Sequence, residues 1–238
     1  MRLAIMAAAG LIALAQLTST ARAAALRVAP VMIDLSAPSA ASSVKLWNDG
    51  EKPVNVQIRI FRWAQKDGKD VYLPAEGIAV SPPITTLKSN AENIVRIVRT
   101  TKAPVSGEES YRLIVDELPK PGPRAAGTVT LIVRQSIPVF FSSPETGAAS
   151  VRWAVRRQQN SYLVTAENRG GKRLRISDMT LSDGASVIGS KIGLVGYALC
   201  NSSASWLIPA KAGGSGAIKI HALSEAGPFD ATARIVGK

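Results

Sequence analysis

Residues 54–60 have the sequence VNVQIRI, in which Val54, Val56, Ile58 and Ile60 alternate with polar side chains. A period of two places the apolar side chains on one face of a strand and the polar ones on the other. This stretch therefore predicts a half-buried β-strand. It decides the fold class because the same alternation recurs along most of the chain.

Working outward, further strands are expected throughout, separated by turns rich in Gly, Pro and Asn. Their predicted ranges are 43–47, 94–98, 111–118, 129–141, 151–155, 162–166, 174–176, 218–220 and 231–236. No segment after the N-terminus shows a sustained helical period. Many short strands joined by such turns are typical of sandwiches and barrels, so we predict an all-β fold.

The domain organisation follows from two changes in composition. Residues 142–150, SSPETGAAS, lack large apolar side chains and indicate a linker. At the N-terminus a long uncharged run precedes Ala21-Arg22-Ala23, which fits a signal-peptide cleavage site. We predict a signal peptide (1–23), an N-terminal domain (24–143), a hinge (144–150) and a C-terminal domain (151–238), with a periplasmic location.

Charge and cysteine content limit the kinds of partner and fold. The formal net charge is +12, and removal of Arg2 and Arg22 with the signal peptide leaves 12 − 2 = +10. The basic residues are spread over many strands of an exported chain, which argues against nucleic acid and favours an acidic protein partner. Cys200 is the only cysteine, so no internal disulfide forms. It is either a buried thiol, which we favour, or a reactive one.

The sequence offers no set of catalytic or metal-binding residues. His221 is the only histidine, and no Cys/His cluster or phosphate-binding loop occurs. Asp116 and Glu117 are neighbours in a strand and point to opposite faces, so they are no acid–base pair. We therefore expect no enzyme activity, no catalytic residue, no metal, no cofactor and no small-molecule substrate.

Two long strands, 111–118 (YRLIVDEL) and 129–141 (VTLIVRQSIPVFF), indicate a hairpin. With a symmetric loop at 119–127, the numbers of facing residues sum to 246, which places Ile114 opposite Ile132 and Arg112 opposite Arg134. Two facing cations destabilise a sheet unless an anion lies between them, and a carboxylate suits arginine best. The alternative is a pair of solvated arginines that splay apart.

The second of these strands is apolar on both faces near its start. Val129, Leu131 and Val133 share one face, and Ile132 lies on the arginine face. At a sheet edge such a strand is an aggregation hazard unless it pairs with another chain by strand addition. The alternative is an ordinary central strand that is buried on both faces.

An ordered set of motifs resembles a known family. The set is Leu46-Trp47-Asn48-Asp49-Gly50, Gln57-Ile58-Arg59-Ile60-Phe61-Arg62-Trp63, Ser81-Pro82-Pro83, Val95-Arg96-Ile97, Glu109-Ser110-Tyr111-Arg112, Asp116-Glu117-Leu118-Pro119, Ser136-Ile137-Pro138-Val139-Phe140, Gly196-Tyr197-Ala198-Leu199 and Ser205-Trp206-Leu207-Ile208-Pro209. Over nearly its whole mature length the chain resembles the periplasmic pilus chaperones of the chaperone–usher pathway. The resemblance is closest to their archaic branch, which serves spore-coat-like pilins.

The resemblance implies two immunoglobulin-like β-sandwich domains in tandem and a mechanism. Pilins of the pathway lack their last strand, and the chaperone lends its G1 strand, here Val129 to Ile137, before an outer-membrane usher receives the pilin. The expected donor residues are Val129, Leu131, Ile132 and Val133. The expected partners are pilin subunits and the usher.

The resemblance also implies a basic pair that anchors the pilin's C-terminal carboxylate. Ser136 stands at the G1 position where better-known members have lysine, with its hydroxyl as a further possible donor. Arg112 and Arg134 are therefore the predicted anchor, with Arg27 or Arg96 as the alternative. The second functional hypothesis is a secreted immunoglobulin-like structural or adhesive module, such as a pilus component. A single incomplete domain with a disulfide would fit that hypothesis better.

Overall fold

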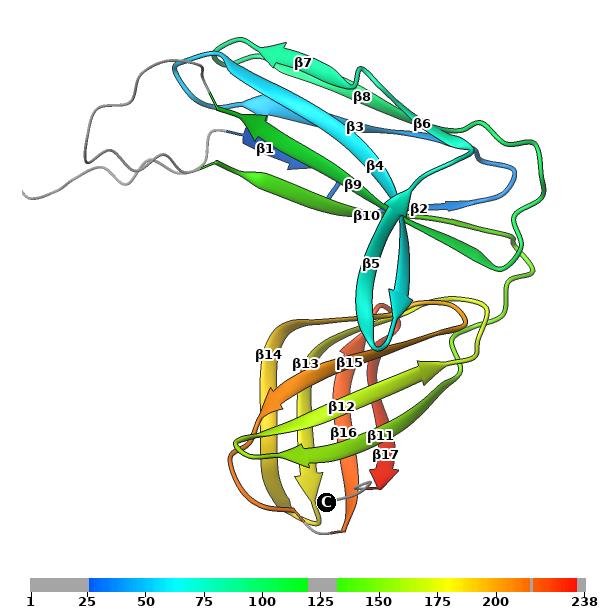
Figure 1. Cartoon of the computed structure of the whole chain (residues 1–238), viewed down its shortest axis with the longest axis vertical. Coiled ribbons are helices and arrows are strands. Elements are labelled where there is room, and N and C mark those ends of the chain that lie inside the picture. The colour runs from blue at the N-terminus through cyan, green and yellow to red at the C-terminus, as the bar shows by residue number, and fades with distance from the viewer. Residues whose placement is uncertain (1–25, 120–131, 215, 235–238) are drawn as a thin grey trace, which may run out of the picture.

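The computed structural model describes residues 26–119, 132–214 and 216–234. The predicted signal peptide, residues 1–23, lies outside the described residues, as do Val129 and Leu131. The described residues form strands and no helix, so this part of the chain has no helical membrane span. Two β-sandwiches follow one another along the chain, and the predicted all-β class is confirmed (Figure 1).

The N-terminal sandwich consists of two sheets. One sheet has the strand order β1 (Leu26–Ala29), β3 (Ala41–Asn48), β8 (Glu92–Arg99) and β6 (Ile78–Ser81). The other, the large sheet, has the order β2 (Ile33–Ser36), β10 (Arg134–Ser142), β9 (Glu108–Leu118), β4 (Val54–Lys66) and β5 (Lys69–Pro74), with β7 (Ile84–Leu87) also on β4. All pairs are antiparallel except β2 with β10, which are parallel.

The core of this sandwich is built from the alternation seen in the sequence. Every second residue of β4 and β9 points inward and meets the inward residues of β3 and β8. The fully buried members are Val56, Ile58, Leu113, Val115, Val44, Leu46, Val95 and Ile97. Each such side chain contributes roughly 1.5–3 kcal/mol when it leaves water. The opposite faces of β4 and β9 are thereby free to hold polar groups.

The C-terminal sandwich repeats this architecture with seven described strands. One sheet has the order β11 (Val151–Gln158), β12 (Ser161–Asn168) and β15 (Ser202–Pro209), and the other has the order β14 (Ser186–Ala198), β13 (Leu174–Asp183), β16 (Ala217–Ser224) and β17 (Gly227–Arg234). Its separate core contains Val164, Ile176, Leu181, Ile208 and Ile220. The segment predicted as a hinge, 144–150, lies between β10 and β11.

A buried asparagine closes an equivalent turn in each sandwich. The side-chain amide of Asn48 donates to three backbone carbonyls, and its oxygen accepts from the N–H of Gly50 at 3.0 Å. In the second sandwich Asn168 donates to two carbonyls, and its oxygen accepts from the N–H of Gly170 at 2.9 Å. Because both side chains are buried, these bonds satisfy groups that would otherwise be costly to desolvate.

The register of the β9–β10 hairpin differs from the prediction. Facing residues sum to 250 rather than 246, so Arg112 lies opposite Pro138, and Arg134 lies opposite Asp116. Likewise Ile114 faces Ser136 instead of Ile132. In the observed register Ile137 and Val139 of β10 face Leu113 and Tyr111 of β9 in the core, and the connection is four residues longer than the symmetric loop assumed. The predicted juxtaposition of Arg112 and Arg134 is therefore wrong.

The two sandwiches meet at one end of each and diverge from there, which gives the molecule a bent outline (Figure 1). The hairpin of β4 and β5 extends from the first sandwich and reaches β15 of the second. At its tip the carbonyl of Gly68 accepts a hydrogen bond from the backbone N–H of Ser205 at 2.9 Å. Farther back, the Gln65 side chain bonds the backbone of Tyr197 and Leu199. The hairpin therefore fixes one side of the junction.

Candidate functional site

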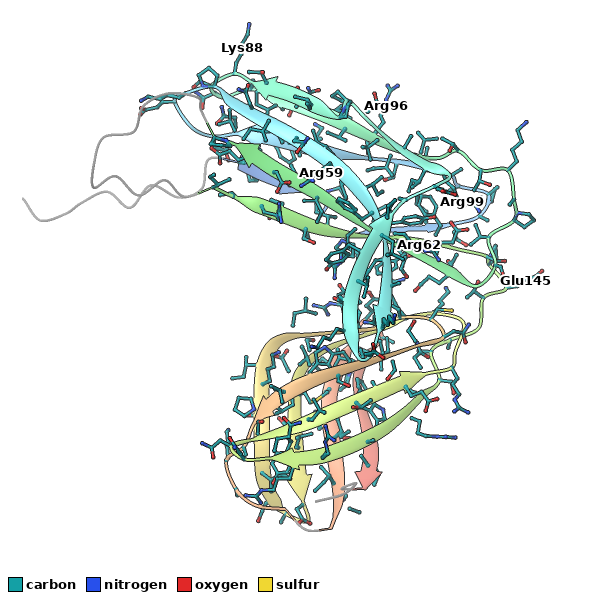
Figure 2. The ribbon with its side chains drawn as sticks, in the orientation of Figure 1. Arg59, Arg62, Lys88, Arg96, Arg99 and Glu145 are labelled. Carbon is teal, nitrogen blue, oxygen red and sulfur yellow. The ribbon has the colours of Figure 1, made fainter. Side chains whose placement is uncertain are left out.

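The face of the large sheet that points away from the core is rich in cations. Three rows across β4, β9 and β10 define this cation-rich face: Phe61–Arg112–Pro138, Arg59–Ile114–Ser136 and Gln57–Asp116–Arg134. The alternation that buries Leu113 and Val115 turns Arg112, Ile114 and Asp116 outward. Arg59 is seen on β4 in Figure 2.

Arg112 lies at the end of this face that is closest to the second sandwich. Its guanidinium carbon is 3.7 Å from the centroid of the Trp63 ring and 5.6 Å from that of Tyr197. Trp63, Phe140, Tyr197 and Leu199 form a small buried cluster that joins the two sandwiches. Stacking on flat aromatic faces holds the guanidinium in a fixed orientation and suits arginine better than lysine.

The Arg112 cation has no carboxylate within ion-pair distance among the described residues. Burial lowers its pKa, and the neighbouring Tyr72 and Asp70 oppose this effect. Arginine nevertheless stays charged in proteins. The buried Nε of Arg112 and the buried Nε1 of Trp63 also find no acceptor in this part of the chain. A buried donor without a partner costs about 1–3 kcal/mol, so the corner favours a ligand that brings acceptor atoms.

Arg134, the other predicted anchor residue, is already engaged. Its Nε lies 2.5 Å from Oδ1 of Asp116, and Nη2 of Arg59 lies 2.6 Å from Oδ2 of the same carboxylate. Partial burial acts to raise the pKa of Asp116, but the hydrogen bonds from both arginines outweigh it and the pKa lies below its usual value. Arg112 and Arg134 share a face but lie four residues apart along it, about 13 Å at 3.3 Å per residue.

The edge of the large sheet is open along the first half of β10. β2 pairs with Val139 to Ser142 only, and no other described strand lies against Arg134 to Pro138 on that side. The open half is a row of backbone donors and acceptors, which is the arrangement that accepts an added strand. The alternative prediction of a central strand buried on both faces does not describe this half of β10.

The predicted donor residues fall at the start of this edge. Ile132 is 50% exposed, and Val133, whose carbonyl accepts from the N–H of Glu117, is half-buried. Val129 and Leu131 lie outside the described residues. Ile132 precedes β10, which begins at Arg134, so its place on the arginine face stays a prediction.

The two alternative anchor residues lie on the other sheet. Arg27 of β1 forms a salt bridge with Asp49 at 2.8 Å and stacks over Trp47. Arg96 of β8 is exposed on the side of the N-terminal sandwich away from the second one (Figure 2). Neither residue belongs to the rows of the cation-rich face.

No cluster of three potential metal ligands occurs among the described residues. The ring Nδ1 of His221 lies 2.8 Å from Oδ1 of the exposed Asp230. Cys200 is half-buried, and its sulfur accepts from the Asn201 amide at 3.4 Å.

Sequence reasoning missed the aromatic residues around Arg112. Trp63 continues the alternation of residues 54–60 on the polar side of β4, so its place on the same face as Arg59 was available from the pattern. Tyr72 lies opposite Trp63 on β5. Tyr197 comes from the other sandwich, and no local pattern predicts that contact.

The comparisons with known proteins agree with this architecture. The family model of the pili and flagellar-assembly chaperone PapD N-terminal domain matches residues 25–146, just over half of the chain. A comparison with curated protein sequences returned no significant match.

Several solved structures are similar to the chain over most of its length. A chain of the CsuC–CsuE chaperone–tip adhesion subunit pre-assembly complex, from archaic chaperone–usher Csu pili of Acinetobacter baumannii, is 27% identical, with a TM-score of 0.70 over 90% of this chain and 100% of that one. A chain of the Salmonella enterica SafA pilin–SafB chaperone complex is 18% identical (TM-score 0.61; 90% and 99% covered). The E. coli chaperone DraB is 22% identical (TM-score 0.57; 87% and 96% covered). The last two likenesses show the shared fold.

Proposed function

Since this chain belongs to the family of pili and flagellar-assembly chaperones, we propose that it is a periplasmic chaperone that binds pilus subunits by strand addition and passes them to an outer-membrane usher. The observation that supports this most is the open edge of β10, which ends beside the unpaired cation of Arg112. The Csu structure, which holds a chaperone with a tip adhesion subunit, supports the same role.

The added strand would lie along Arg134 to Pro138, and its terminal carboxylate would bind Arg112. β2 occupies the edge beyond Pro138, so the body of the subunit extends past Arg134, and its last strand runs in the same direction as β10. Val129, Leu131, Ile132 and Val133 would supply apolar contacts to the subunit. The net charge of 12 − 2 = +10 expected after removal of the signal peptide would favour encounter with an acidic subunit.

We propose Arg112 as the principal anchor, and the role of Arg134 as its partner is tested in parallel. The experiment measures binding of a cognate pilus subunit, with its C-terminus either free or amidated. Arg112→Ala is expected to lose at least about tenfold in affinity for the free form, because truncation removes a desolvated charge contact. Amidation should weaken binding to the wild type but add little in this variant.

The control is Arg96→Ala, which removes an exposed arginine from the opposite sheet and should leave both affinities unchanged. Arg134→Ala, alone and combined with Arg112→Ala, shows whether the predicted second anchor contributes. Amidation sensitivity that persists in the double variant would contradict an anchor on this face.

A further inference from the structure

The hydrogen bonds of β10 alternate in a way that fixes which backbone groups face the open edge. The N–H of Glu117 donates to the carbonyl of Val133 at 3.0 Å, and these two residues lie directly opposite each other in the register. In an antiparallel ladder such bonded pairs alternate with non-bonded ones. Val133, Gln135 and Ile137 therefore turn their backbone groups toward β9.

The even-numbered residues of β10 turn their backbone groups the other way, toward β2 and the open edge. The carbonyl of Ser142 bears this out, because it accepts from the N–H of Ala37, just beyond β2, at 2.9 Å. Arg134 and Ser136 therefore each present one N–H and one carbonyl to the open edge. Pro138, the next residue of this set, has a carbonyl but no N–H.

Pro138, which lacks the N–H, lies where the part of the β10 edge that is covered by β2 begins. β2 pairs with β10 from Val139 onward, with Ile33 as its first partner. If the parallel ladder of β2 extended one hydrogen bond further toward the start of β10, the N–H of residue 138 would have to bond the carbonyl of Val31. Val31 is instead 75% exposed. The ladder of β2 thus stops where Pro138 offers no donor, and the edge before it stays open.

Arg112 lies in the same row as Pro138, directly across on β9. The buried ring of Phe140, packed 5.9 Å from Trp63 and 6.0 Å from Tyr197, closes the face beyond that row. A strand that ends at Pro138 pairs with every outward donor and places its terminal carboxylate beside a cation. A strand that continues finds no donor at residue 138 and meets β2.

We infer that Pro138 sets the inner end of the docking edge, so that the site selects a strand that terminates there and fixes its register. This inference rests on the proposed function and adds the residue that ends the edge: Arg112 binds the terminal carboxylate, and Pro138 disfavours an internal segment that would continue past it. Pro138 acts here as a positioning residue, through the backbone donor that it lacks.

The test compares one cognate pilus subunit with its natural C-terminus and with Gly-Ser appended. The wild type should bind the natural end at least about tenfold more tightly, because the extension leaves one or two hydrogen bonds unmade and moves the carboxylate away from Arg112. Pro138→Ala restores an N–H at the edge and should reduce this preference by at least about threefold, while the part that Arg112 contributes remains. Lactic acid at position 138 has the alanine side chain without an N–H and should keep the wild-type preference.

Register provides a second readout that a merely structural role would not change. Disulfide cross-linking from Ser136→Cys to single cysteines in the last strand of the subunit should give one dominant partner in the wild-type background and two or more with Pro138→Ala. Equal binding of both ends by the wild type, or an unchanged preference in Pro138→Ala, would overturn the inference. Failure of the wild type to bind the natural subunit at all would instead contradict the proposed function.

Discussion

At the scale of single residues, Asp116 decides which arginine of the cation-rich face is available to a ligand. Its carboxylate accepts hydrogen bonds from Arg59 and Arg134, and its side chain is 11% exposed. Arg112 stacks on Trp63 and has no carboxylate partner in the described part of the chain. Two arginines that look equivalent in the sequence therefore differ because one of them faces an aspartate across the hairpin.

The depressed pKa of Asp116 predicts a pH-dependent contribution to stability. The folded-state pKa lies below the unfolded value of about 3.9, so ionised Asp116 stabilises the fold above that value. The contribution is lost as pH falls through the folded pKa. Asp116→Asn should cost roughly 1–2 kcal/mol at pH 7 and almost nothing at strongly acid pH.

Thermal unfolding of the wild type and of Asp116→Asn between pH 2 and pH 7 measures the difference in stability between them. Glu117→Gln, next to it on the other face of the strand, controls for the change in net charge. A deficit in Asp116→Asn that stays constant down to pH 2 would show that the carboxylate charge is not its source.

At the scale of elements, alternate residues of β10 have different roles. The backbone groups of odd-numbered residues bond β9, and those of Arg134 and Ser136 face the open edge. Ser136→Pro removes an N–H that points to the open edge and should leave the free chaperone nearly as stable as the wild type. The same variant should bind pilus subunits at least about tenfold more weakly, since an added strand loses a hydrogen bond in the middle of the edge. Gln135→Pro removes an N–H that points to β9 and should destabilise the fold by roughly 1–3 kcal/mol.

Chemical denaturation and subunit binding are measured on both proline variants. Together they distinguish a backbone N–H that faces the open edge from one that bonds β9. Comparable destabilisation by both prolines would mean that Ser136 also bonds within the chaperone, and the edge would then be closed.

Strands were predicted well where the sequence pattern is local and poorly where the structure depends on residues far apart in the chain. The alternation of residues 54–60 is local, and it correctly predicted β4, the burial of Val56 and Ile58 and the outward place of Arg59. β14 was missed because three glycines and shifts of register interrupt its pattern. The β9–β10 register failed for a different reason: the length of a connection is not visible in the alternation of the strands that it joins.

The candidate site shows the same limit. Arg112 was predicted from the motif and from a hairpin register that proved wrong, and its role as an anchor stays a prediction. The pairing of Arg134 with Asp116 required the true register, and the contact with Tyr197 required the arrangement of the two sandwiches. The open edge of β10 was proposed as one of two alternatives, since edge and centre of a sheet differ only in what lies beside the strand.

At the scale of the whole molecule, Arg173 links the two sandwiches. This residue precedes β13, and its side chain is 3% exposed. It forms ion pairs with Glu108 of β9, Asp34 of β2 and Glu225 of the second sandwich. Its guanidinium carbon also lies 3.7 Å from the ring centroid of Phe140. The junction therefore combines a buried charge network with the β4–β5 hairpin, and both lie next to the Arg112 corner.

Arg173→Met is expected to loosen the junction, because it removes the cation and leaves the fully buried carboxylate of Glu108 without its partner. Breaking a buried ion pair from one side typically costs about 3–5 kcal/mol.

Arg99→Met is the matched control: Arg99 is also buried and pairs with Glu109 at 2.8 Å, but both residues belong to the N-terminal sandwich. Both variants should lower the unfolding temperature, whereas only Arg173→Met should widen the distribution of distances between the sandwiches. Spin labels on one exposed residue of each sandwich, read by pulsed electron resonance, measure that distribution. Because Arg112 is in contact with Tyr197 of the second sandwich, a looser junction should also weaken subunit binding in Arg173→Met and not in Arg99→Met. Equal distance distributions in the two variants would show that the hairpin alone sets the angle between the sandwiches.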